Sequence, residues 1–253
     1  MHTKTHSIIA NVLVGDNPLA TPLNISISPD EKFAYITNFG LLSQPGNTVS
    51  VIDTKTHVVI TTISVEDNPS SIAFTPDSKI AYILNTGNSN FPGNTVFVID
   101  VKTHSIIATV QVGRYPTAIS ITRDEKLAYI LKDIEGLSVI DTKTHSVIAT
   151  TPPLGTVPFF VTFSPNGEMV YASNRDINNR NVNIVDTSTH SIIATISDGL
   201  DQPHAIAFTS EGKSAYVTNF GNHTVSVIDT KTHRIIATVR DGLSSVDVVI
   251  SSN

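Results

Sequence analysis

The chain lacks several features that common classes of protein need. Its 253 residues include no cysteine and no tryptophan, and charged side chains make up only 15% of them. The absence of cysteine excludes disulfides, thiol nucleophiles and thiolate metal sites. No apolar run approaches the roughly 18 residues of a membrane span, and the first residues, Met1 to His6, contain no apolar signal core. We therefore expect neither membrane insertion nor a signal peptide within this chain.

An excess of positive charge is also missing, since the formal net charge is −6 at pH 7. Nucleic acids and anionic membrane surfaces are bound by clustered Lys and Arg, so neither is expected as a partner. What the chain does have is an apolar content of 40%, much of it Ile and Val, with many Thr residues beside them. Because β-branched side chains suit a pleated, packed surface, this composition favours an all-β protein.

An internal repeat is the main signal in the sequence. The histidine of the phrase Asp-Thr-Lys-Thr-His and its variants recurs at spacings of 51, 47, 41, 45 and 43 residues. Two further markers, a tyrosine after Ala or Val and the Asp that ends Val-Ile-Asp, recur with it in one fixed order. The three sets are His6, His57, His104, His145, His190 and His233; Tyr35, Tyr82, Tyr129, Tyr171 and Tyr216; and Asp53, Asp100, Asp141, Asp186 and Asp229.

Each period contains four short segments with strand character. In the last complete period these are residues 204–209, 215–219, 224–229 and 234–239, joined by short links of turn-forming residues. Four antiparallel strands at a period of roughly 40–45 residues are typical of a β-propeller. In such a fold each sheet packs between two neighbouring sheets, which explains why these strands lack a clean alternation of apolar and polar residues.

The repeat also resembles a known family. Ala-Tyr-Ile-Thr-Asn at 34–38, Ala-Tyr-Val-Thr-Asn at 215–219 and Asn-Thr-Val-Ser-Val-Ile-Asp-Thr at 47–54 are similar to the YVTN-type β-propeller repeat, over essentially the whole chain. The resemblance implies a periplasmic or cell-surface location and admits a structural, surface-layer role, whereas the residues themselves leave the compartment open, a cytoplasmic one included. Related propellers include lactone hydrolases and the propeller subunits of quinone- or haem-using oxidoreductases, so the resemblance also admits an enzyme.

Counting the markers predicts one propeller domain over residues 1–253. Its five complete blades lie at about 18–64, 68–112, 116–151, 158–197 and 203–240, and the first strand of each follows Pro18, Pro69, Pro116, Pro158 or Pro203. The leftover strands at 7–14 and 245–251 can pair as a thin sixth blade, which we favour. A closed five-bladed ring is the alternative. A third option is an unsealed gap, with self-association through the bare edges of the terminal strands.

The repeated histidines are more consistent with turns than with metal binding. Each lies between the third and fourth strands, where a tight hairpin commonly needs a left-handed residue that Asn, Asp and His tolerate. The Asp before each turn is expected to cap it through backbone N–H groups. No nucleophile elbow, phosphate-binding glycine loop or metal-binding motif is present. We therefore expect no catalytic residues, no metal and no cofactor.

Sequence variation concentrates on one face of the predicted propeller. The links from strand two to strand three are enlarged at 38–47 and 85–94 and charged at 174–181. Loops on a rigid scaffold are where binding residues gather, so we expect a non-enzymatic binding or scaffold module that engages a partner protein or a polar small ligand through this face. The candidate residues are Asn38, Phe39, Leu41, Asn85, Phe91, Arg114, Tyr115, Asn174, Arg175, Asp201, His204 and Phe220.

Overall fold

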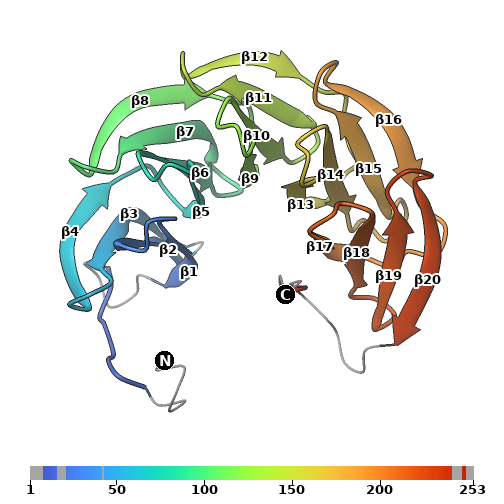
Figure 1. The fold of residues 1–253 in the computed structure, drawn as a ribbon. Coiled ribbons are helices and arrows are strands. Elements are labelled where there is room, and N and C mark those ends of the chain that lie inside the picture. The colour runs from blue at the N-terminus through green and yellow to red at the C-terminus, as the bar shows by residue number, and fades with distance from the viewer. Residues whose placement is uncertain (1–7, 16–20, 42, 241–246, 249–253) are drawn as a thin grey trace. The chain divides into compact units, whose positions relative to one another are not determined.

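The computed structural model describes residues 8–15, 21–41, 43–240 and 247–248, which form twenty strands and no helix (Figure 1). None of these residues therefore belongs to a helix that could span a membrane. The chain divides into two compact units, residues 1–111 and 112–253.

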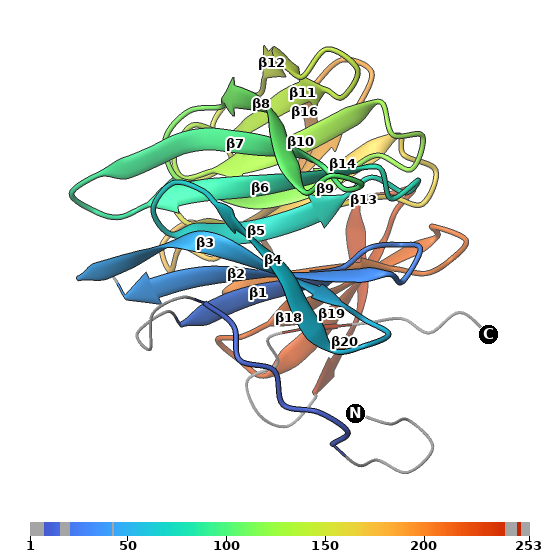
Figure 2. The same cartoon turned by 90° about the vertical axis from the view of Figure 1, so that its left-hand side faces the viewer.

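The first unit contains two antiparallel four-stranded sheets, each with its strands in chain order (Figure 2). The first blade consists of β1 (Pro22–Ile27), β2 (Phe33–Leu41), β3 (Gln44–Asp53) and β4 (Val58–Ser64). The second consists of β5 (Pro69–Phe74), β6 (Ile80–Gly87), β7 (Pro92–Asp100) and β8 (Ser105–Gln111).

The second unit contains three sheets of the same kind. The third blade consists of β9 (Pro116–Ile121), β10 (Leu127–Lys132), β11 (Leu137–Asp141) and β12 (Ser146–Thr150). The fourth consists of β13 (Pro158–Phe163), β14 (Met169–Asn174), β15 (Asn181–Asp186) and β16 (Ser191–Ile196). The fifth consists of β17 (Pro203–Phe208), β18 (Ser214–Asn219), β19 (Thr224–Asp229) and β20 (Arg234–Arg240). The prediction of an all-β fold with five complete four-stranded blades is confirmed.

The first blade begins later than the sequence predicted. Its first strand starts at Pro22, because Pro22 pairs with Asn38 in the same register as Pro69 pairs with Asn85 in the second blade. Pro18, the predicted start, lies outside the described residues.

The enlarged links of the first two blades are also not loops. Strands β2 and β3 pair as far as Leu41 and Gln44, and β6 and β7 pair as far as Gly87 and Pro92. The extra residues therefore lengthen two β-hairpins, since their backbones continue the ladder beyond a bulge next to Asn38 or Asn85.

The predicted N-terminal strand is not formed over its described part. Residues 8–14 belong to no sheet, and Val12 and Val14 instead pack by their side chains against Ala34, Ile36 and Ile52 of the first blade. Of the predicted strand at 245–251, only residues 247 and 248 are described, and they form no strand. The predicted pairing of the two terminal strands therefore lies outside the described residues.

The turn role of the repeated histidines is confirmed. His57, His104, His145, His190 and His233 all have φ between 51° and 60°, in the left-handed region; His6 lies outside the described residues. The Asp before each turn accepts bonds from the turn backbone, as Asp53 Oδ1 does from the N–H of Thr56 at 2.7 Å. A hairpin that requires one left-handed residue therefore explains the repeated phrase.

The same histidines also join neighbouring blades, which the sequence did not predict. The hydroxyl of Tyr35 in the first blade is hydrogen-bonded to Nδ1 of His104 in the second, at 2.7 Å. In the second unit, Tyr129 bonds to His190 at 2.6 Å and Tyr171 bonds to His233 at 3.3 Å. These three tyrosines are fully buried. The tyrosine and histidine markers thus form one contact that repeats from blade to blade.

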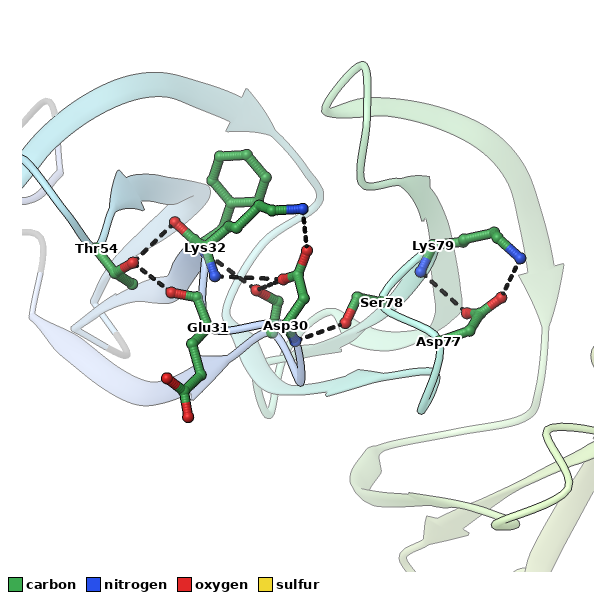
Figure 3. A network of polar contacts seen from close by, with 9 residues as sticks. Asp30, Glu31, Lys32, Thr54, Asp77, Ser78 and Lys79 are labelled. Atoms are coloured by element: carbon green, nitrogen blue, oxygen red, sulfur yellow. Dashed lines mark hydrogen bonds and ion pairs between the residues drawn. The ribbon is translucent and has the colours of Figure 1, made fainter.

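On the face that carries these turns, a polar network joins the first two blades (Figure 3). The backbone N–H of Asp30 donates to Oγ of Ser78 at 2.9 Å, and the Asp30 carboxylate pairs with Nζ of Lys32 at 2.8 Å. The side-chain hydrogen bonds from Lys32 and from Ser28 lower the pKa of Asp30 to about 2. Asp30 pairs with Lys32 within one turn and Asp77 pairs with Lys79 within the other, so we assign this network a structural role.

The histidine contacts predict a pH dependence of stability. Burial lowers the pKa of His104, so the folded protein takes up this proton at lower pH than the unfolded chain does. The resulting stability is complete above the unfolded pKa near 6.5, and it is lost as the pH falls through the lowered folded pKa. When the pH is lowered from 7.5 to 5, the free energy of unfolding, measured in urea, is expected to fall less for His104→Asn than for the wild type. Asn tolerates the left-handed turn but does not titrate.

The matched control for this experiment is His57→Asn. His57 occupies the same turn position but is exposed, and within the described residues it makes no contact with a tyrosine. This variant should retain the wild-type dependence on pH. If both variants flatten the dependence equally, the assignment to the buried contact of His104 is wrong.

Candidate binding site

The site begins with a β-bulge in the first strand of each blade. In the fourth blade, Pro158 pairs with Asn174 and Phe160 pairs with Ser173, so Phe159 between them has no partner in the ladder. In the fifth blade, His204 follows Pro203 in the same way, and the N–H of the next residue, Ala205, donates to Oγ1 of Thr218 at 3.0 Å. A bulge changes the direction of the side chain that it carries. Phe159 and His204 therefore occupy equivalent positions on adjacent blades.

The rings of these two bulge residues are in contact and tilted relative to each other. The ring centroids of Phe159 and His204 lie 3.9 Å apart, with an angle of 42° between the rings. The hydroxyl of Ser173 in the fourth blade donates to the carbonyl oxygen of His204 at 2.7 Å. This bond ties the backbone of one bulge to the neighbouring blade, so the ring contact rests on a fixed scaffold.

Two residues from the adjacent links extend this contact into a stack. The guanidinium carbon of Arg175, just after β14, lies 4.3 Å from the ring centroid of Phe159. Phe220, just after β18, lies 6.3 Å from His204 with an angle of 30° between the rings. Arg175, Phe159 and His204 are half-buried, and Phe220 is 39% exposed. We call these four residues the aromatic stack.

Charged residues lie beside the stack. Arg180 forms an ion pair with the carboxylate of Asp201, whose backbone N–H donates to Oδ1 of Asn219 at 3.2 Å. Asp176 accepts from the hydroxyl of Thr156 and, at 2.8 Å, from the N–H of Asn178. The aromatic rings of the stack therefore lie next to both positively and negatively charged side chains.

The structure brings together five of the predicted site residues in the second unit, from the fourth and fifth blades. Arg175, His204 and Phe220 belong to the stack, and Asp201 lies beside it in the ion pair. Asn174 is fully buried and holds the link in place, since its Oδ1 accepts from the N–H of Val157 at 2.9 Å. Arg114 and Tyr115, just before β9 of the third blade, form a separate pair with the guanidinium 5.7 Å from the ring centroid.

The predicted residues of the first unit are of two kinds. Asn38 and Asn85 are fully buried, and their Nδ2 groups donate to threonine hydroxyls of the neighbouring strand at 3.0 Å. Phe91 and Leu41 stand at the ends of the lengthened hairpins, 74% and 43% exposed, whereas Phe39 is half-buried. A hollow of about 360 Å³ lies beside Phe91 and is lined by Glu66, Asp67, Gly87, Phe91, Pro92, Gly93 and Asn94.

Two residues of this region were missed by the sequence analysis, namely Phe159 and Arg180. Aligning the residue that follows each first-strand proline gives Leu23, Ser70, Thr117, Phe159 and His204, so the position of His204 in the repeat already pointed to Phe159. Arg180 lies inside the charged link that the sequence singled out as a whole. Among the described residues, no three His, Cys, Asp or Glu side chains lie together in a way that could hold a metal ion.

A scan against protein-family models finds no match, and neither does a search of curated proteins. Among solved structures, the chain is similar to hydrazine synthase of Kuenenia stuttgartiensis, at 19% sequence identity and a TM-score of 0.65. The similarity covers 92% of this chain and 90% of that chain. At this level of identity it shows the fold alone, and it supports a β-propeller built from four-stranded blades.

Proposed function

We propose that this propeller is a non-enzymatic binding module that engages its ligand through the aromatic stack of the second unit. The observation that carries the proposal is the continuous contact from Arg175 through Phe159 and His204 to Phe220, built on two adjacent blades. A propeller fold in itself suggests a binding or scaffold role only in general terms, because function depends on the site that a fold carries.

The residue types of the stack support this role. Aromatic and arginine side chains are enriched among the few residues that contribute most of the binding energy at protein interfaces. Here Arg175 is already seated on Phe159 before any ligand arrives, and the bond from Ser173 fixes the backbone of His204. This prior ordering lowers the entropic cost of binding.

The surroundings of the stack define the chemistry of the ligand. A planar group can extend the stack on Phe220, which is the most exposed member. Charged groups of the ligand can exchange with the ion pair of Arg180 and Asp201. A segment of a partner protein with an aromatic and a charged side chain fits these features, and so does a polar small ligand with a planar ring.

The proposal predicts that Arg175→Ala and Phe220→Ala each weaken the binding of the same ligands. A displayed library of random peptides and an array of small polar ligands would be selected on the wild-type protein, and the dissociation constants of the retained ligands would then be measured. We expect each variant to raise these constants at least tenfold, because a buried anchor at an interface contributes about 2 kcal/mol.

The matched control is Arg123→Ala, which removes an exposed arginine of the same unit. Arg123 lines a different hollow, whose other lining residues include Asp124, Lys126 and Pro165. It should bind the selected ligands as the wild type does. Ligands that bind the wild type, Arg175→Ala and Phe220→Ala equally well would place the binding site elsewhere.

We also propose that the chain belongs to the YVTN-type propellers. What supports this is that the residues of the repeated strand-two phrase have separate structural roles. In the fifth blade, Thr218 accepts from the N–H of Ala205 in the bulge, and Nδ2 of Asn219 donates to the hydroxyls of Thr224 and Ser226. An experimental structure in which Thr218 and Asn219 did not make these contacts would count against the assignment.

A further inference from the structure

One sheet face of the first blade differs from its counterparts in the other blades. Ile25 pairs with Ile36 in the same register as Ile72 pairs with Ile83, and Val161 and Ile206 occupy this position in the fourth and fifth blades. Where a preceding blade of the same unit covers the position, the side chain is buried: the exposed fraction is 6% for Ile72, 4% for Val161 and 3% for Ile206. Ile25 is 63% exposed.

The neighbours of Ile25 show that the whole face is apolar. Ile27 projects from the same side of β1 as Ile25 and is 56% exposed. Leu23, at the bulge of this strand, is 58% exposed and lines the same hollow as Ile25. A hollow of about 480 Å³ lies over this side, and its lining includes Val12, Val14 and Ile36. We call Leu23, Ile25 and Ile27 the first-blade face.

The fifth blade has an uncovered face of the complementary kind. Val239 pairs with Val225 as Ile63 pairs with Val49 and Ile196 pairs with Val182. Val239 is 56% exposed, whereas Ile63 and Ile196, which a following blade covers, are 5% and 8% exposed. Tyr216 is half-buried, although the tyrosine at this position is fully buried in the third and fourth blades. We call Val239 and Tyr216 the last-blade face.

The tyrosine–histidine contact shows which interaction each of the two faces lacks. Inside each unit, a tyrosine of one blade bonds to the histidine of the next, as Tyr35 does to His104 and Tyr171 does to His233. Within the described residues, Tyr216 makes no such bond, and His57 of the first blade is exposed and makes none either. The two faces are therefore the two halves of an interface that already recurs inside the chain.

We propose that the first-blade face docks the last-blade face of a second copy of this chain, with the hydroxyl of Tyr216 bonded to His57. A second copy can supply the missing half, because the first-blade face and the last-blade face are different surfaces and every copy carries both. Such an interface is heterologous, so each association leaves one face free at either end. The assembly then grows until it closes into a ring or continues as an open chain.

Two blocked variants test this proposal. Ile25→Lys places a charge on the first-blade face, and Val239→Lys places one on the last-blade face; both positions are more than half exposed, so folding should survive. Sedimentation velocity should show concentration-dependent association for the wild type, and association at least tenfold weaker for each variant alone. An equimolar mixture of the two variants should form a dimer and nothing larger, because one intact face remains on each partner.

Ile60→Lys is the matched control. Ile60 is 48% exposed in β4, and the equivalent residues of the other four blades, Ile107, Ile148, Ile193 and Ile236, are exposed as well. It should associate as the wild type does. Leu23→Lys provides a second block of the same face if Ile25→Lys fails to fold by circular dichroism. A mixture of the blocked variants that remains monomeric overturns the proposal. It is also overturned by a wild type that stays monomeric at every concentration. A lower melting temperature of the Ile25→Lys variant would then show that the first-blade face is covered within one copy.

Discussion

Replacing Tyr129 by alanine is expected to lower the free energy of unfolding by about 4 kcal/mol. The side chain is fully buried, its ring meets that of Phe163 edge to face at 5.2 Å, and its hydroxyl lies 2.6 Å from His190. The substitution removes all three contributions and leaves a cavity between two blades. Urea unfolding, followed by circular dichroism, measures the change.

Two further variants separate these contributions. Tyr129→Phe keeps the packing and loses only the bond to His190, so its cost should be about 1 kcal/mol. Tyr216→Ala removes the tyrosine at the equivalent position of the fifth blade, where it is half-buried, and should cost clearly less than Tyr129→Ala. If Tyr216→Ala and Tyr129→Ala were equally destabilising, coverage by the next blade would not be the source of the effect.

Replacing Gly93 by alanine is expected to cost about 3 kcal/mol through overpacking. A Cβ atom at this position would lie 2.0 Å from the carbonyl oxygen of Asn85 and 2.6 Å from the carbonyl carbon of Thr86. Both are backbone atoms of the facing strand in the lengthened hairpin, so neither can swing aside as a side chain would. The hairpin must open locally to admit the methyl group, and thermal unfolding would show the loss.

A second glycine provides the control. At Gly167 a Cβ atom would meet nothing within 4 Å, but the backbone has φ of +74°. Gly167→Ala therefore tests the left-handed conformation without a steric clash, and it should cost about 1 kcal/mol. Gly46 repeats the environment of Gly93, with a Cβ atom 2.0 Å from the carbonyl oxygen of Asn38. Gly46→Ala should therefore resemble Gly93→Ala and not Gly167→Ala.

The features of the fold that could be predicted from the sequence are those set within a single blade. The turn that contains His57 or His233 is specified by five consecutive residues, so its left-handed histidine follows from local stereochemistry. The strands of the fifth blade likewise lie within one or two residues of their predicted positions, because each is bounded by its own turn. The bond from Tyr35 to His104 was not foreseen, since it joins residues 69 positions apart.

The site followed the same division. Arg175 and Phe220 could be predicted because they lie in links that were expected on one face, and His204 because it stands at the start of a strand that follows such a link. Phe159 was missed because the sequence alone does not show that the residue after Pro158 is left out of the ladder by a bulge. The lengthened hairpins were mistaken for loops because their Gly, Pro and Asn residues are typical of turns, whereas here they continue the pairing.

The contact from a tyrosine to the next histidine has an evolutionary consequence. Because a blade recognises its neighbour through residues that every repeat encodes, a duplicated or deleted repeat brings with it both halves of the junction that it needs. Recombination between the segments that encode Asp-Thr-Lys-Thr-His and its variants would add or remove whole blades and leave the surviving junctions intact. Natural relatives of this chain should therefore differ in blade number more readily than in the sequence of their junctions.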